Sequence, residues 1–161
     1  MTEIPYVYPH SDLTPQIERG EVFFNDQAYS NIDIGSPLYF LIRTPPPPIS
    51  IYAWLRISIQ AGGLVTFYEN PTVTTAGTPA MLWNANRQSP KTATMSLFSQ
   101  PTIGAPGTEL GTQNFSDAAG LEFAGLQAPI ILAQNMDYYL TFAPKTNNNI
   151  ANFLHVFWEK S

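Results

Sequence analysis

Residues 50–63 read SIYAWLRISIQAGG, and this stretch decides the fold. One face of it carries five aliphatic side chains, those of Ile51, Ala53, Leu55, Ile57 and Ile59. The alternate positions are larger or more polar, namely Tyr52, Trp54, Arg56, Ser58 and Gln60. A period of two residues is typical of a half-buried β-strand. The Gly62-Gly63 pair that follows favours a hairpin-type turn.

The rest of the chain continues as short strands separated by turns rich in Gly, Pro and Asn. The candidate strands are 36–44, 64–69, 80–84, 92–99, 128–134, 136–144 and 152–160. No stretch shows a convincing helical repeat. Many short strands with regular punctuation predict an all-β, antiparallel β-sandwich, jelly-roll-like in topology. We assign residues 37–161 to this domain.

Residues 1–36 differ from this body in charge. They contain six acidic residues and one arginine, a net charge of −5, which equals the net charge of the whole chain. We expect an extended, acidic N-terminal arm, with an integral strand of the sandwich as the competing interpretation. In the arm interpretation the segment docks on another protein, and four aromatic side chains serve as its anchors: Tyr6, Tyr8, Phe23 and Phe24.

Composition excludes several classes of function. Charged residues make up only 12% of the 161 residues, against roughly 25% in an ordinary soluble domain. There is no cysteine, so the chain has neither disulfides nor thiolate metal ligands. No basic patch suggests nucleic acid, and no apolar run has the length of a membrane span. We therefore expect a protein made in the cytoplasm, with no nucleic-acid or membrane partner.

A phrase occurs twice, thirty residues apart. Pro71-Thr72 is followed by Gly77-Thr78, and Pro101-Thr102 is followed by Gly107-Thr108. Proline ends a strand because it lacks an N–H, and glycine permits a positive φ or a tight bend. Each copy therefore predicts a strand, a compact loop and a strand. Nothing in the phrase is a nucleophile, a base or a phosphate cradle, so we interpret it as architecture first, with recognition by the loop tips as a further role.

These segments resemble a group of small virion proteins of tailed bacteriophages. The resemblance covers about residues 50–160 and rests on YENPTVTTAGTPAMLWNANRQS, PTIGAPGTEL, MDYYLTF and HVFWEK. The matching positions are Glu69, Pro71, Thr72, Gly77, Thr78, Asn84, Asn86, Arg87, Tyr138, Tyr139, Trp158 and Glu159. Such proteins are jelly-roll decoration (cement) proteins or head fibres on the outside of the capsid. The resemblance does not extend to residues 1–36.

The exposed side of the 51–60 strand is the candidate interface. Tyr52, Trp54 and Arg56 are residue types enriched in the cores of protein interfaces. The alternative is that the second sheet covers this face. Arg87 has two interpretations as well: it reaches a carboxylate or carbonyl on a neighbouring chain, or it pairs with Glu69 inside the fold. We favour the pair with Glu69.

Catalytic and metal-binding patterns are weak. The acidic residues of the β body follow no glycosidase spacing, and no Gly-x-Ser-x-Gly elbow accompanies the two histidines, His10 and His155. No calcium-loop motif occurs. We expect no enzyme activity, no cofactor and no metal site.

The sequence as a whole predicts a structural virion protein. It is expected to bind the outer face of an assembled phage capsid, with the major capsid protein as its partner. It is also expected to form a homo-oligomer, with a trimer favoured over a dimer. The alternative is a receptor-binding or carbohydrate-binding module of a phage fibre or tail.

Overall fold

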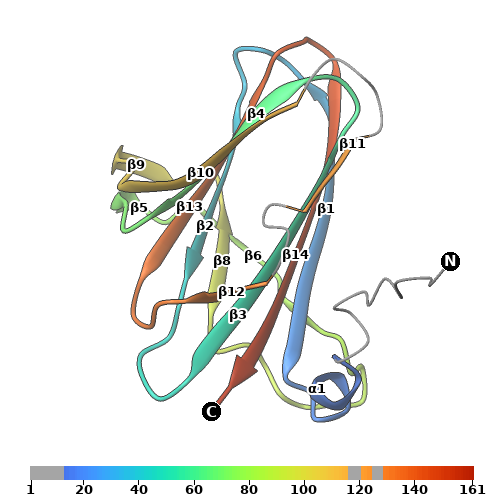
Figure 1. The fold of residues 1–161 in the computed structure, drawn as a ribbon, viewed down its shortest axis with the longest axis vertical. Coiled ribbons are helices and arrows are strands. Elements are labelled where there is room, and N and C mark those ends of the chain that lie inside the picture. The colour runs from blue at the N-terminus through green and yellow to red at the C-terminus, as the bar shows by residue number, and fades with distance from the viewer. Residues whose placement is uncertain (1–12, 116–120, 125–128) are drawn as a thin grey trace, which may run out of the picture.

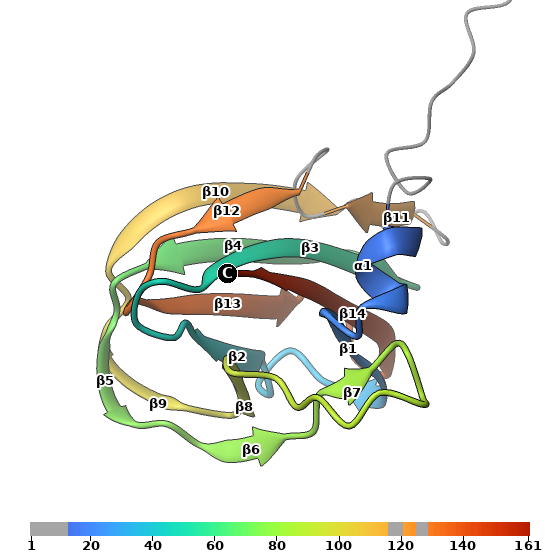
Figure 2. The ribbon, with the colours of Figure 1, turned by 90° about the horizontal axis from the view of Figure 1, so that it is seen from below.

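The structure, a computed structural model, describes residues 13–115, 121–124 and 129–161, with the backbone alone for 121–124. Two antiparallel six-stranded sheets pack face to face (Figures 1 and 2). The predicted β-sandwich is confirmed. In the described part of the chain the single helix is α1, Thr14–Glu18, which precedes the first strand.

Sheet A contains, in spatial order, β11 (Leu121–Ala124), β3 (Ser50–Ile59), β14 (Asn149–Lys160), β1 (Val22–Ile32) and β7 (Trp83–Asn84), and β12 (Ile130–Leu132) also pairs with β3. Sheet B contains β10 (Thr108–Phe115), β4 (Gly63–Glu69), β13 (Asp137–Pro144), β2 (Leu38–Arg43), β8 (Ser96–Ser99) and β6 (Thr78–Ala80). Sheet C is a two-stranded ribbon of β5 (Thr72–Thr75) and β9 (Thr102–Ala105).

The alternation predicted for residues 51–60 is confirmed in β3. Its five aliphatic side chains are at most 3% exposed and face sheet B, whereas the alternate residues are half-buried on the other side. Burying one such aliphatic side chain contributes about 1.5–3 kcal/mol. β3 also pairs with β14 along its full length. These two features make β3 a central strand of sheet A.

The N-terminal segment requires a correction. Val22–Ile32, predicted as part of an arm, forms β1 and pairs with β14 on one side and β7 on the other. The competing interpretation, an integral strand, is therefore correct for these residues. The period of two was hard to recognise because polar Asn25 and Gln27 lie on the inward face, opposite His155 and Phe153 of β14. Tyr6 and Tyr8 lie outside the described residues.

The two copies of the repeated phrase interlock. β6, which ends the first copy, pairs with β8, which begins the second. In return β10, which ends the second copy, pairs with β4, which begins the first. Between them β5 and β9 pair with each other as sheet C. Sheet B, in the order β10-β4-β13-β2-β8-β6, is therefore nearly symmetric about its two middle strands, β13 and β2. At each edge, the last strand of one copy pairs with the first strand of the other.

The residues that precede the repeated prolines hold each copy against the middle of sheet B. Asn70 and Gln100, just before the buried Pro71 and Pro101, have φ of 54° and 53°. Asn70 N–H donates to Asp137 O of β13, and Gln100 N–H donates to Tyr39 O of β2, both at 2.9 Å. Each copy is thus fastened to the centre of sheet B. The repeat is architecture, as predicted.

The glycines of the phrase should be sensitive to substitution. Gly77 and Gly107 both have φ of 89°, and a Cβ on either would collide with backbone carbonyls of the other copy, those of Ser99 and Glu69 respectively. We expect Gly77→Ala and Gly107→Ala each to lower the free energy of unfolding by at least about 2 kcal/mol in denaturant titrations. Gly35→Ala is the control, because nothing lies within 4 Å of its Cβ position. Equal effects at Gly77 and Gly35 would contradict the interlock.

His155 is a polar group enclosed in the core. It is 1% exposed and its ring stacks between those of Phe153 and Phe157. Neither ring nitrogen of His155 has a hydrogen-bond partner within the described residues. Asn25 of β1 lies opposite His155 in the sheet, and its Oδ1 also has no hydrogen-bond partner there. Burial disfavours the charged ring and lowers the pKa of His155 from 6.5 to about 4.

This burial predicts acid sensitivity. As the pH falls, His155 binds a proton in the unfolded chain before it does so in the folded protein. The free energy of unfolding is therefore unaffected by protonation of this residue above pH 6.5 and decreases as the pH falls towards 4. The loss amounts to about 3 kcal/mol. We expect His155→Phe to reduce the pH dependence of unfolding between pH 6.5 and 4.5. The same pH dependence in wild type and His155→Phe would refute this assignment.

Candidate functional site

One face of sheet A points away from sheet B (Figure 2). By strand register, this outer face gathers aromatic side chains from four strands. Ile131 of β12, Tyr52 of β3 and Trp158 of β14 are successive partners across the sheet. The rings of Tyr52 and Trp158 stack at 5.3 Å with an interplanar angle of 11°. These three side chains form the first row of the face.

A second row runs parallel to the first. Trp54 of β3 lies opposite Val156 of β14, which lies opposite Phe24 of β1, and Phe24 in turn lies opposite Trp83 of β7. Trp83 is 45% exposed and Ile131 of the first row is 63% exposed. We call the two rows together the aromatic face: Phe24, Tyr52, Trp54, Trp83, Ile131, Val156 and Trp158.

Charged groups border the aromatic face. In the next row Arg56 of β3 and Asp26 of β1 flank Leu154 of β14. At the other border the guanidinium of Arg87 lies over the ring of Trp83, 4.9 Å from its centroid. A cation over an indole ring is attracted by its negative face. An apolar centre with charges at its border is the usual anatomy of a protein interface.

Most of the residues predicted for an interface meet here. Phe24, Tyr52 and Trp54 lie on the aromatic face, and Arg56 and Arg87 lie at its border. The alternative that the second sheet covers Tyr52 and Trp54 is wrong, because sheet B packs on the Ile51 side of β3. Phe23 is a further correction. It is 1% exposed and points into the fold, so it cannot anchor another protein.

The predicted pair between Arg87 and Glu69 is also wrong. Glu69 ends β4 in sheet B, whereas Arg87 follows β7 of sheet A and lies over Trp83. The neighbouring asparagines have structural roles. Asn84 Nδ2 donates to the carbonyls of Gly20 and Lys91, both at 3.0 Å, and Asn86 Nδ2 donates to Glu18 O. They fasten the turn after α1 to the loop after β7.

Sequence reasoning did not identify four members of the aromatic face: Trp83, Ile131, Val156 and Trp158. Val156 and Trp158 could have been inferred, since they alternate with buried residues in the predicted strand 152–160. Trp83 and Ile131 lie on strands of two and three residues, which are too short to show a period. Only the order of strands in the sheet brings them to this face.

The acidic and histidine side chains of the described residues are the candidates for a metal site. No three His, Asp or Glu side chains within this part of the chain are grouped so that they could hold a metal ion. Two of the acidic residues in the β body have partners within the fold, since Asp137 binds Arg43 and Glu159 accepts hydrogen bonds from Thr94. Within the residues that the structure describes, no helix has the length and apolar character to span a membrane.

The sequence matches no model of a known protein family and no curated protein.

Proposed function

We propose that this protein is a structural virion component that attaches to the outer face of an assembled bacteriophage capsid. The aromatic face is the observation that carries the proposal, because it gathers apolar side chains from five strands on one side of sheet A, with three indole or phenol rings at its centre. Trp and Tyr supply much of the binding energy at protein interfaces. The partner is the major capsid protein, and attachment requires no catalysis and no cofactor.

The order of the strands is a further observation that supports the proposal. Successive strands from β1 to β4, and again from β12 to β14, alternate between sheets A and B. This alternation favours a jelly-roll-like topology, the one that the resemblance to phage decoration proteins implies.

The proposal predicts a specific loss of capsid binding. Ile131→Ser removes an exposed apolar side chain from the aromatic face, whereas Ile34→Ser removes a similarly exposed one, at 58%, from the loop between β1 and β2. We expect Ile131→Ser to weaken co-sedimentation with empty capsids of the same genome by about tenfold, and Ile34→Ser to leave it unchanged.

The measurement also separates the two functions considered from sequence. Equal binding by both variants would show that another surface contacts the shell. No binding of wild-type protein to capsids, together with binding to host-cell surfaces, would favour the alternative of a receptor-binding module.

Self-association is the second part of the proposal, with a trimer favoured over a dimer. β10 is an edge strand of sheet B, and residues 108–112 of it are exposed. It carries neither lysine nor proline, and its protection as an edge is limited to the charge of Glu109 and the irregular register between Glu109 and Gly111. We expect sedimentation equilibrium at micromolar concentration to give the mass of three chains. A single species with the mass of one chain would count against this part.

A further inference from the structure

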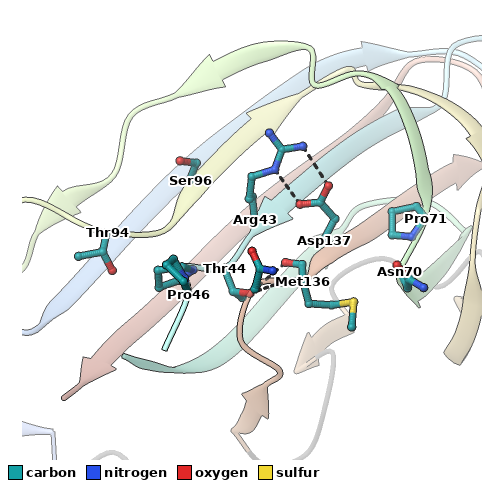
Figure 3. A pocket seen from close by; sticks show the side chains of 11 residues that line it. Arg43, Thr44, Pro46, Asn70, Pro71, Thr94, Ser96, Met136 and Asp137 are labelled. Atoms are coloured by element: carbon teal, nitrogen blue, oxygen red, sulfur yellow. Dashed lines mark hydrogen bonds and ion pairs between the residues drawn. The ribbon is translucent and has the colours of Figure 1, made fainter. Parts of the chain in front are cut away.

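A pocket of about 470 Å³ lies where β2 ends and β13 begins (Figure 3), and none of its lining residues belongs to the aromatic face. Four segments far apart in sequence form it: the end of β2 with the loop after it, the turn between β4 and β5, the residues around the start of β8, and the turn before β13. Its volume falls within the range of about 300–1,000 Å³ that is usual for small-molecule sites.

An ion pair occupies the centre of the pocket wall. Arg43 Nε lies 2.8 Å from Asp137 Oδ1 and Arg43 Nη2 lies 2.9 Å from Asp137 Oδ2, so the two planar groups meet fork to fork. The Arg43 guanidinium also lies 5.7 Å from the centroid of the Phe98 ring. These contacts hold both groups in place before any ligand arrives. Neither hydrogen bond uses Nη1 of Arg43.

Polar groups without an internal role surround this pair. The side chains of Asn70, Asn135 and Ser96 line the pocket and make no hydrogen bond to the described residues. In Figure 3 Ser96 and Asn70 lie on opposite sides of the ion pair. Two carboxamides and a hydroxyl offer both donors and acceptors. Pro46, Pro71 and Met136 supply apolar surface between them.

Charge restricts the class of ligand. Arg43 and Asp137 neutralise each other, and Asp137 is the one carboxylate among the lining residues. A metal ion would need more oxygen ligands of negative charge. An anion would meet no net positive charge here and would approach a chain of net charge −5. The chemistry that fits is a neutral molecule with several hydroxyl groups and apolar C–H surfaces.

We propose that this pocket binds a neutral saccharide unit, through hydroxyl contacts to Arg43, Asp137, Asn70, Asn135 and Ser96. Ring C–H groups of the sugar pack on the proline and methionine surfaces. The site goes beyond capsid attachment and does not depend on it, because it uses sheet B and its loops whereas attachment uses sheet A. A single sugar ring has few atoms, so we expect a dissociation constant on the order of 1 mM.

The test is a titration of the isotope-labelled, full-length protein followed by amide chemical shifts. The probes are D-glucose, D-galactose, D-mannose, N-acetyl-D-glucosamine and their β-1,4-linked disaccharides, with D-glucuronate and sodium sulfate as charged comparisons. We expect at least one neutral sugar to produce saturable shifts confined to residues 43–44, 70, 94–96 and 134–137. No saturable shift for any neutral sugar at 50 mM, or saturation by the charged probes alone, would overturn the proposal.

Two substitutions remove pocket groups without straining the backbone. Asn70 and Asn135 have φ of 54° and 52°, a conformation that glycine adopts freely, so Asn70→Gly and Asn135→Gly delete only the carboxamides. The matched control is Gln100→Gly, since Gln100 has φ of 53°, also precedes a repeated proline, and lies outside this pocket. We expect each pocket variant to weaken binding by about threefold to tenfold, and the control to leave it unchanged. Equal affinities for all three variants and wild type would place the sugar elsewhere and refute this site.

Discussion

The pairing of β3 with β14, in a register that buries one face of both strands, is the constraint on which the rest of the structure depends. The pairing extends from Ser50 opposite Lys160 to Ile59 opposite Ala151. Side chains alternate along each strand, so a slip of one residue would expose the aliphatic row and bury the aromatic one. The core that forces Ile57 and Phe153 inward therefore also directs Trp54 and Trp158 outward. The aromatic face is a consequence of the same register that stabilises the fold.

The sequence predicted this fold wherever alternation was strong, and it failed where a polar residue interrupts the inward face. In β3 every inward position is aliphatic, and the strand was predicted with the correct orientation. In β1 the inward positions include Asn25, which lies opposite the buried His155. That polar pair concealed the period and led to the wrong prediction of an arm. Phe23 and Phe24 illustrate the consequence, because adjacent residues of a strand point to opposite faces and only Phe24 belongs to the aromatic face.

Local sequence patterns could not predict which distant segments pair as strands. The repeated phrase predicted two similar loops, but nothing in either copy specifies that each supplies the outer strand for the other. The two copies of the phrase differ in their relation to the pocket. Asn70 and Pro71 of the first copy line the pocket beside Arg43 and Asp137, whereas the corresponding Gln100 and Pro101 do not. A nearly symmetric framework thus carries one asymmetric site, distinct from the aromatic face of sheet A.

In the proposed mode of attachment the aromatic face meets the shell, and the pocket, which sheet B and its loops form, does not. Cryo-electron microscopy of capsids saturated with the wild-type protein tests this orientation directly. We predict density in which β3, β14 and β7 of sheet A lie against the capsid surface, with the rings of Trp54 and Trp158 in contact with the major capsid protein. Density in which sheet B or the β5–β9 ribbon faces the shell, with the aromatic face open to solvent, would contradict it.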